Sequence, residues 1–512
     1  MQIGNNELEK LVKHGLSTWK KAENPTGKYI FFENNKEFWL PLMIGKFVTA
    51  KSLEEKYGYR TIAIKSGFDK ECDAIYKSFG MEPFFLTGKR HLGAYIIGCI
   101  KALKFLLSGN NGERLLHLQY KGIHIGDLVY DQIIRTVKGK YTVDKIEGKA
   151  EFQILAKAYT VADICDKLYK KNPPAYFVAG DIICINGIYV RMAAKYGAKV
   201  VSVCTGYKTK LLAKDYRNQM YEPNYHGIVG DEVEKIIQDG MPAGWLEEAE
   251  KRLENIFKGI GDWNTENAFG NKKIEEKNQV LSQIGINNDK KNIIIMAHCF
   301  SDAPHCGGEF VYKDYYEWLE ETLKLTSQID SVNWILRAHP SRAQYGEQGV
   351  VEELYEKYKN DNLHWLSDEY SAAMVPVLAD ALITVNGTAG VEFSCKGIPC
   401  VNAGNAFYTR LGFTQYAKTK DEYEMILRKL YQIEPLSDDK KLMAKKALYL
   451  NSGLRTLVDD ELQNMAFGYY KKNFNDRTET LKYNSEFAEQ YVKKFNGENI
   501  RNSYFYCSAQ EM

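Results

Sequence analysis

Short apolar runs rich in valine and isoleucine alternate with longer segments whose apolar residues recur at helical spacing. In the first half of the chain the apolar runs lie at 28–32, 60–67, 114–120, 175–180 and 198–203. Segments with helical spacing lie between them, at 68–80, 127–137, 151–171 and 186–196. Strands that alternate with helices predict an α/β domain with a mainly parallel sheet.

A second alternating series follows in the other half of the chain. Its predicted strands are 291–298, 332–340, 362–366, 381–387 and 398–404. Its predicted helices are 314–328, 350–359, 370–379 and 389–396. A polar, lysine-rich stretch separates the two series, and the chain after about residue 420 has helical spacing and no further strand series. The pattern therefore predicts a second α/β domain.

We predict two Rossmann-like α/β domains that face a cleft, with a helical C-terminal tail. This is the outline of a GT-B glycosyltransferase, and other two-domain α/β enzymes share it, because a fold does not fix a function. The predicted parts are an N-terminal α/β domain at 1–230, a polar helical linker region at 231–290, a C-terminal α/β domain at 291–425 and a tail at 426–512.

Charge and cysteine content narrow the class of partner and the compartment. The 512 residues include 68 basic and 66 acidic side chains, so the net charge of +2 favours no nucleic acid polymer as the main partner. The ten cysteines include no C-x-x-C pair. We therefore expect reduced, buried thiols in a cytoplasmic protein.

One segment bears on membranes. The N-terminus has no signal-peptide pattern, and no run of about 18 apolar residues predicts a membrane span. The nearest candidate, 94–109, has helical apolar spacing and is interrupted by Lys101 and Lys104. We expect a buried amphipathic helix. The alternative is a helix on the inner surface of the membrane, which would make the protein peripheral there.

The strongest local motif is "VNGTAGVEFSCKGIPCVNAG" at 385–404. A predicted strand ends there, and a turn of small residues opens a helix, so that free N–H groups would face an anion such as phosphate. A capped helix packed on a sheet is the structural alternative. The candidate donor-binding residues are Asn386, Gly387, Thr388, Ala389, Gly390 and, as an acceptor for ribose hydroxyls, Glu392.

Two more loops follow predicted strands of the second series. "LRAHPS" carries Arg337 and His339, both donors suited to phosphate. Because ligands of open α/β sheets bind outside the carboxyl ends of the strands, we expect them at the ligand site. A histidine that merely satisfies its neighbours is the alternative.

The loop "HCFSDAPHC" at 298–306 resembles a metal cluster in composition, but its spacing matches no standard zinc pattern. We predict no metal and no cofactor. The loop is instead predicted to bind ligand, with a structural turn as the alternative. The candidate ligand-binding residues are His298, Ser301 and His305, and Asp302 is a candidate catalytic residue.

The first half of the chain offers "KGIHIGDLVYDQIIR". Asp127 or His124 could serve as a general base, although Asp127 is equally a plausible helix N-cap. Asp131 and Arg135 are four residues apart and would pair on one helix. Further on, Asn186-Gly187 could open a helix towards a ligand, and the alternative is an ordinary βαβ unit with a solvated Arg191.

The C-terminal motifs resemble those of bacterial capsule polysaccharide biosynthesis proteins, a GT-B-like family that includes the Kdo transferases of capsule linkers. The matching residues are His339-Pro340, Asn386 to Gly390, Glu392, Gly397-Ile398-Pro399 and Gly404 to Tyr408, within 291–418. The resemblance implies a nucleotide-sugar donor bound mainly by the C-terminal domain. It also implies His339 and the 386–390 turn at the phosphate or nucleotide, and an acceptor bound by the N-terminal domain.

The resemblance has limits that bear on the donor. Cys400 stands where the family usually has valine, and the N-terminal half does not match the Kdo enzymes, so CMP-Kdo is not implied. We expect a glycosyltransferase that requires no metal and acts on a surface polysaccharide or glycolipid. A CDP-glycerol- or ribitol-type polyol-phosphate transferase and a non-catalytic assembly or export protein are the alternatives.

Overall fold

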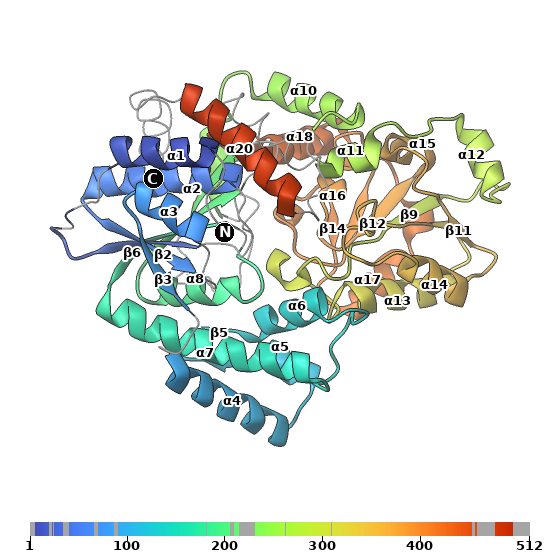
Figure 1. Cartoon of the computed structure of the whole chain (residues 1–512). Coiled ribbons are helices and arrows are strands. Elements are labelled where there is room, and N and C mark those ends of the chain that lie inside the picture. The colour runs from blue at the N-terminus through green and yellow to red at the C-terminus, as the bar shows by residue number, and fades with distance from the viewer. Residues whose placement is uncertain are drawn as a thin grey trace. The chain divides into compact units, whose positions relative to one another are not determined.

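A computed structural model of the chain falls into two compact units, described one at a time (Figure 1). Unit 1 comprises Met1–Val129, Lys145–Met220 and Arg455–Met512, and unit 2 comprises Tyr130–Asp144 and Tyr221–Leu454. The structure describes residues 6–19, 23, 25–33, 40–65, 70–86, 91–180, 182–204, 209–214, 231–261, 263–308, 310–452, 456–457 and 477–494.

Unit 1 is built on a seven-stranded sheet, mainly parallel, in the order β15-β8-β7-β6-β1-β2-β3. The chain starts in the middle at β1, adds β2 and β3 on one side, and then adds β6 and β7 on the other. This order is Rossmann-like. The strands are β1 (Tyr29–Glu33), β2 (Arg60–Lys65), β3 (Glu82–Phe85), β6 (Pro174–Ala179), β7 (Lys199–Cys204) and the antiparallel β8 (Thr209–Lys214) and β15 (Thr456–Leu457).

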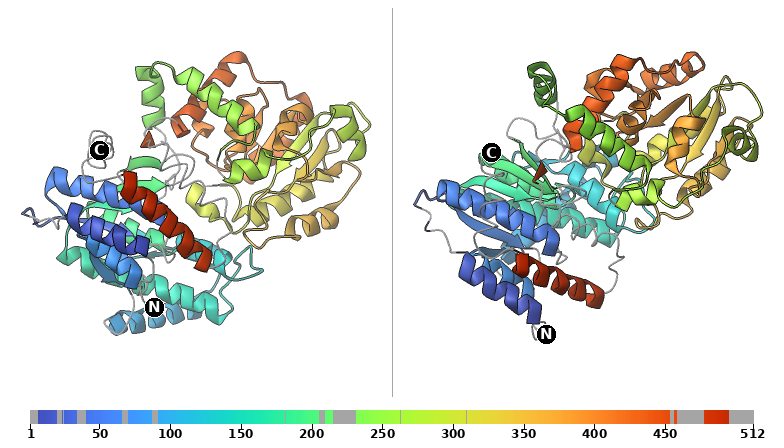
Figure 2. Two further views of the ribbon diagram at one scale, coloured as in Figure 1. Left: turned by 45° about the horizontal axis from the view of Figure 1, so that its top comes forward. Right: turned by 90° about the horizontal axis from the view of Figure 1, so that it is seen from above.

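Helices cover both faces of this sheet because side chains alternate along the strands. Phe32 of β1 packs against Phe47 and Tyr76 on one face, whereas the neighbouring Phe31 meets Tyr169 on the other. The first face carries α1 (Asn6–Thr18), α2 (Leu40–Tyr57), α3 (Lys70–Ser78) and α20 (Arg477–Lys494) (Figure 2). The second carries α7 (Lys149–Lys171) and α8 (Asn186–Lys195), with α4 (Leu92–Leu107) outside α7.

One predicted strand of this half is wrong. Residues 112–116 form helix α5 (Gly112–Leu116), because the Asn111 side chain caps it by accepting a hydrogen bond from the Arg114 amide at 2.7 Å. Only β4 (Gln119–Tyr120) of the predicted run is a strand, and it pairs with β5 (Ile123–His124) as a small antiparallel ribbon. Helix α6 (Gly126–Thr136) follows directly.

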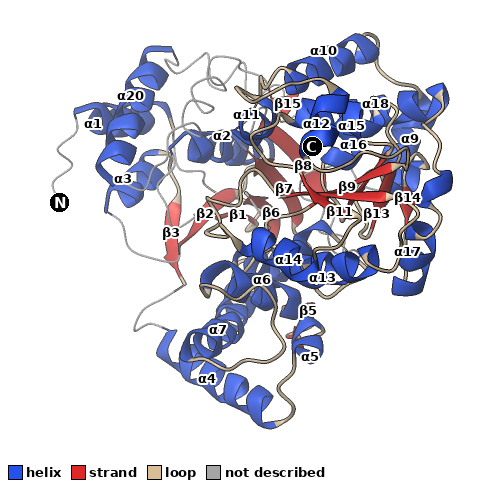
Figure 3. Cartoon of the chain, turned by 90° about the vertical axis from the view of Figure 1, so that its right-hand side faces the viewer, coloured by secondary structure: helices blue, strands red, loops and turns tan. Residues whose placement is uncertain are grey.

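Unit 2 is built on a six-stranded parallel sheet in the order β11-β10-β9-β12-β13-β14. Its strands are among those drawn in red in Figure 3. The five predicted strands of the second series are all present, and β14 is an addition. The strands are β9 (Asn292–Met296), β10 (Asn333–Arg337), β11 (Leu363–Trp365), β12 (Ala381–Thr384), β13 (Cys400–Asn402) and β14 (Gln415–Tyr416).

Two hydrophobic layers enclose this sheet. Ile293 and Ile295 of β9 lie in the layer formed with α13 (Tyr315–Thr326), α14 (Val350–Tyr358) and α17 (Lys420–Leu427). Ile294 points to the opposite layer, which the remaining helices supply. These are α10 (Trp245–Phe257), α11 (Trp263–Phe269), α12 (Lys277–Gln283), α15 (Val375–Leu378), α16 (Ala389–Ser394) and α18 (Asp438–Ser452).

The two units differ from the four predicted parts. Residues 231–290 are helical as predicted, but Leu253, Phe269 and Val280 are buried in the core of unit 2, so this region belongs to that unit. The predicted tail is shared, because α18 packs in unit 2 while α20 packs against α1 in unit 1. Residues 66–69, 458–476 and 495–512 of the predicted elements lie outside the described residues.

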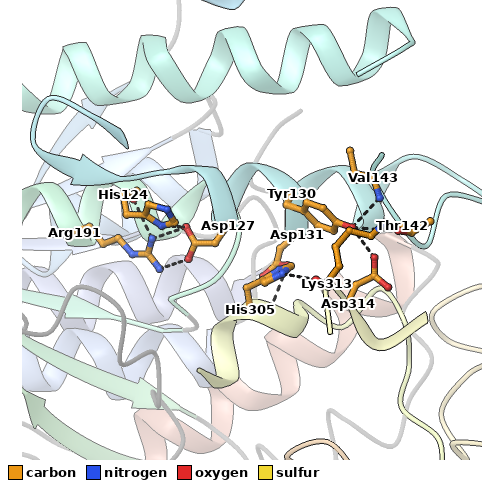
Figure 4. Close-up of polar contacts among 10 residues, drawn as sticks. All are labelled: His124, Asp127, Tyr130, Asp131, Thr142, Val143, Arg191, His305, Lys313 and Asp314. Atoms are coloured by element: carbon orange, nitrogen blue, oxygen red, sulfur yellow. Dashed lines mark hydrogen bonds and ion pairs between the residues drawn. The ribbon is translucent and has the colours of Figure 1, made fainter. Parts of the chain in front are cut away.

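The segment 130–144 belongs to unit 2 because a tyrosine ties it there. Tyr130 donates a hydrogen bond to Asp314 at 2.6 Å and accepts one from the Val143 amide at 2.8 Å (Figure 4). Asp314 in turn caps α13 by accepting from the Glu317 amide at 2.7 Å.

The chain thus consists of two Rossmann-like α/β units, as the sequence predicts. The cleft predicted between them stays a prediction. Among the described helices, none combines the length and the apolar character that a membrane span requires.

Candidate functional site

The strand order of unit 2 locates its candidate ligand site. From β9 the chain proceeds to β10 and β11 on one side, and then returns to add β12, β13 and β14 on the other. Ligands of open α/β sheets bind outside the carboxyl ends of the strands at this reversal point. Two loops lie at this point, one after β9 and one after β12. The loop after β10, the strand next to β9, is one strand further away. These three loops carry the motifs found in the sequence.

His298 follows β9 and is fixed across the reversal point. Its Nε2 accepts a hydrogen bond from the Val385 amide at 3.2 Å and lies 2.9 Å from the Thr384 hydroxyl. Because a backbone N–H can only donate, the ring proton must be on Nδ1. The ring stacks on Tyr315 at 4.3 Å, and burial lowers the pKa of His298 to about 3. His298 is therefore a neutral ring that joins two strand ends.

The turn after β12 presents hydrogen-bond donors without partners. Within the part of the chain that the structure describes, the amides of Asn386, Gly387 and Thr388 have no hydrogen-bond acceptor. Tyr315 donates to Asn386 Oδ1 at 2.9 Å, which leaves the Asn386 amide nitrogen pointing elsewhere. Thr388 is exposed, and its hydroxyl contacts no described residue. Consecutive N–H groups of this kind form an anion-binding concavity.

The glycines of this turn serve packing as well. Tyr408 donates to the Gly387 carbonyl at 2.6 Å and accepts from Asn402 at 3.0 Å. A Cβ at Gly390 would collide with the Tyr408 hydroxyl. Helix α16 has only six residues, so the donors of the turn, rather than a long helix dipole, make this place suited to an anion. Ala389 packs at the edge of the core, and the ribose contact predicted for Glu392 stays a prediction.

His339 follows β10 and is a second neutral donor. Its Nδ1 accepts from the Ser341 amide at 3.1 Å and lies 3.1 Å from the Cys299 thiol. The ring proton is therefore on Nε2, which has no partner among the described residues. Burial lowers the pKa of His339 to about 4 and raises that of the Cys299 thiol. Cys299 is thus a packing thiol, and His339 is a half-buried N–H donor.

Arg337 is not available to a ligand in this arrangement. The side chain is 2% exposed and donates to two backbone carbonyls, Ser367 at 3.4 Å and Tyr370 at 2.6 Å. Burial lowers its pKa to about 10. It lies on β10 two residues before His339 and supports the segment that follows β11. The predicted phosphate contact stays a prediction, and it would require Arg337 to leave these carbonyls.

Ser301 is likewise occupied, by a residue that the sequence did not suggest. Glu347 is fully buried and accepts from the amides of Phe300 and Ser301, each at 2.8 Å, and from the Ser301 hydroxyl. Burial raises the pKa of Glu347. No motif surrounds it, and its role follows only from the fold. Ser301 thus anchors its loop to Glu347, and its predicted ligand contact stays a prediction.

His305 has both ring nitrogens engaged. Nδ1 lies 2.6 Å from Asp131 Oδ1, and Nε2 lies 2.9 Å from the Lys313 carbonyl (Figure 4). A carbonyl and a carboxylate are both acceptors, so each ring nitrogen faces an acceptor. Arg135, the predicted partner of Asp131, pairs instead with Asp302 at 3.3 Å. His305 therefore fixes the loop to α6 and is not positioned as a ligand donor.

The predicted general base of unit 1 is tied up in an ion pair. Arg191 donates to both oxygens of Asp127, at 2.7 and 2.6 Å, and His124 Nδ1 lies 2.9 Å from the same carboxylate (Figure 4). Burial opposes ionisation of Asp127, but the Arg191 charge outweighs it, so that the pKa lies well below the usual range. A carboxylate held ionised in this way is a weak base.

The other members of this cluster are buried too. Arg191 is 5% exposed and His124 is 3% exposed, so the solvated arginine of the sequence interpretation is wrong. We assign His124, Asp127 and Arg191 a structural role. Of the three predicted catalytic residues, only Asp302 is exposed.

No group of three or more histidine, cysteine, aspartate or glutamate side chains among the described residues is arranged to hold a metal ion. Six of the eight cysteines in the described ranges are buried.

Unit 2 is therefore a Rossmann-like α/β unit. The loops near the point where its strand order reverses carry N–H donors on uncharged groups. No known family model and no curated protein matches the sequence. Among solved structures, the beta Kdo 2,7 transferase of Thermosulfurimonas dismutans KpsC matches at 15% identity and a TM-score of 0.33, over 62% of this chain and 85% of the other. The beta Kdo 2,4 transferase of the same KpsC matches at 11% identity and 0.34, over 54% and 80%.

A UDP-GlcNAc 2-epimerase from Neisseria meningitidis, bound to UDP-GlcNAc, is also similar, at 10% identity and a TM-score of 0.24, over 89% of this chain and 99% of the other. These are likenesses of fold.

Proposed function

We propose that the protein is a GT-B-like glycosyltransferase that moves a sugar from a nucleotide-activated donor to a surface polysaccharide or glycolipid, such as a capsular one. The observation that carries the proposal is the row of amides at Asn386, Gly387 and Thr388, which have no acceptor among the described residues and lie at the reversal point of unit 2. The order of the C-terminal motifs supports it. The donor's phosphate groups would bind at this row.

The chemistry follows from the donors. The acceptor hydroxyl oxygen forms a bond to the anomeric carbon, the bond from that carbon to the phosphate oxygen breaks, and the electron pair leaves with the nucleotide. Preorganised N–H groups stabilise the charge that develops on that oxygen. The turn amides and His339 Nε2–H supply them. Asp302, being exposed, is the candidate to take the hydroxyl proton.

We further propose that the transfer requires no bound metal. The support is the GT-B-like motif order together with N–H donors that can meet the phosphate charge directly. Turnover that persists in excess EDTA is the expected result. Loss of turnover in EDTA that Mg²⁺ or Mn²⁺ restores would contradict this part of the proposal.

Calorimetry with CMP, UDP and GDP, then with the matching nucleotide sugars and CDP-glycerol, tests the function. We expect one nucleotide to bind and its sugar to be turned over with release of that nucleotide. Asn386→Ala with Thr388→Ala removes the side-chain donors beside these amides and should weaken binding. Turnover of CDP-glycerol would favour a polyol-phosphate transferase, and no binding of any nucleotide would favour a non-catalytic assembly protein.

The working place of the protein is proposed on the same grounds. A glycolipid or growing polysaccharide acceptor would be met in the cytoplasm, at the inner face of the membrane. Fractionation of cells that express the full chain tests this, with recovery in the cytosolic and peripheral membrane fractions as the expected result.

A further inference from the structure

Helix α4 is apolar over most of its surface but is buried along only one stripe. Ala94, Gly98, Ala102 and Phe105 are the buried residues of this helix, which packs against α7. At Gly98 the approach is so close that a Cβ would collide with the Thr160 hydroxyl and the Ala156 carbonyl. Figure 1 shows α4 on the outside of unit 1, with α7 between it and the sheet.

The opposite side of the helix exposes large apolar side chains, which we call the α4 face. Its residues are Leu92, Tyr95, Ile96, Ile97, Ile100, Leu103 and Leu107. Ile100 is 61% exposed and Leu107 is 80% exposed. The expectation of a buried helix at 94–109 is thus correct for the helix and wrong for its burial. A contiguous exposed apolar surface of this kind marks an interaction site.

Charge indicates the partner. At 100° per residue, Ile96, Ile100, Leu103 and Leu107 fall on one side of α4, and the exposed Lys101 and Lys104 border it. Tyr95 lies along the other border. Between Glu82 and Glu113 the sequence has no aspartate or glutamate. Apolar residues bordered by lysine and by an aromatic residue are typical of helices that lie in a membrane interface.

We propose that the α4 face binds an anionic lipid surface, with α4 lying in the plane of the membrane. Ile96, Ile100 and Leu103 enter the acyl region, and the two lysines contact lipid phosphates. A second copy of the chain fits less well, because protein interfaces are depleted of lysine and because two such faces would bring like charges together. This inference does not depend on the transferase function proposed above.

The test uses the full chain and vesicles of phosphatidylcholine with or without 30 mol% phosphatidylglycerol, separated by flotation. We expect binding to the anionic vesicles and weaker binding at high salt. The triple variant Ile96→Gln, Ile100→Gln, Leu103→Gln keeps helix propensity and should lower the partition coefficient at least about tenfold. Lys101→Gln should lower it about fivefold on anionic vesicles alone.

Met425→Gln is the matched control, because Met425 is 50% exposed on a helix of unit 2, and its binding should equal that of the wild type. Circular dichroism checks that each variant is folded. The proposal is overturned if the wild type stays with the soluble fraction, or if the triple variant binds as well as Met425→Gln. It is also overturned if sedimentation shows a dimer that the triple variant loses while vesicles capture neither form.

Discussion

The polar cluster of unit 1 and the strand-end loops of unit 2 contain similar residue types, but they use them in opposite ways. In unit 1, Asp127 and Arg191 neutralise each other behind a buried His124. In unit 2, His339 and the turn at 386–388 are neutral and retain donors with no partner among the described residues. From this difference we expect the ligand at the strand ends of unit 2, where hydrogen-bonding capacity is unused, and not at the charged cluster of unit 1.

Removing one side of the unit 1 ion pair should have the largest effect. Asp127→Ala leaves the Arg191 guanidinium buried without its carboxylate, which should cost about 3–5 kcal/mol of the free energy of unfolding. Urea unfolding measures it. The double variant Asp127→Leu, Arg191→Met should recover most of the loss, because no charge then stays buried.

A contrary result would reopen a catalytic role for unit 1. If Asp127→Asn kept the stability of the wild type within about 0.5 kcal/mol but abolished turnover, then Asp127 would act on the substrate, and the structural assignment would be wrong.

Glu347→Ala should have the next largest effect. The change leaves the amides of Phe300 and Ser301 without their buried acceptor, at a cost of about 2–3 kcal/mol in the free energy of unfolding. The same variant should weaken nucleotide binding, because the loop that carries His298 and Cys299 loses its anchor. Glu347→Gln keeps one acceptor oxygen, so its free energy of unfolding should lie between those of the wild type and Glu347→Ala. Equal stability of all three proteins would contradict the anchor.

The strand series could be predicted from the sequence because buried parallel strands leave dense valine and isoleucine runs. The run at 114–120 misled because its leucines serve a short helix capped by Asn111, and apolar content alone does not distinguish the two. The limits of the two units were harder to predict from the sequence, because the burial of Phe269 or Tyr491 depends on contacts with residues distant in the sequence.

The candidate site shows the same division. His339 and the 386–390 turn could be found because they follow strands, and strand ends are readable from the pattern. Arg337 and Ser301 also lie at strand ends, but they already make hydrogen bonds within the protein. Arg337 donates to the Tyr370 carbonyl, and Ser301 donates to Glu347. Tertiary packing decides which acceptor a given donor binds, so a sequence pattern does not reveal the partner.

The donors of the unit 2 turn should matter for binding and not for stability. Asn386→Ala and Thr388→Ala should each weaken nucleotide-sugar binding about tenfold, as expected for a lost hydrogen bond to a charged ligand. Unfolding should change by less than about 0.5 kcal/mol for Thr388→Ala, since Thr388 is exposed. Calorimetry measures the affinity. Ser301→Ala is the control with the reverse signature, reduced stability with retained affinity, because the amides of Phe300 and Ser301 still hold the loop to Glu347.

The neutral histidines predict a pH dependence of stability. The pKa values of His298 and His339 are lowered from 6.5 to about 3 and about 4. Between pH 6.5 and 4 the unfolded chain therefore binds protons that the folded protein does not, so stability is full above pH 6.5 and falls as the pH drops. Each histidine contributes about 1 kcal/mol between pH 6.5 and 5.5.

His339→Gln removes one of these groups and should flatten the change by that amount in urea unfolding at the two pH values. An unchanged slope would mean that His339 titrates normally in the folded protein, which would contradict its burial as a neutral ring.

A small change in stability is expected for Asp302→Asn, although this variant separates the two regions most clearly. Asp302 is exposed and its pair with Arg135 spans 3.3 Å, so its loss should cost less than about 1 kcal/mol of the free energy of unfolding. If Asp302 takes the acceptor proton, turnover of the nucleotide sugar should nevertheless fall by about 100-fold or more, with donor affinity unchanged. Replacement of Asp127 would then unfold the protein, whereas replacement of Asp302 would stop turnover. Turnover close to that of the wild type in Asp302→Asn would exclude this carboxylate as the base.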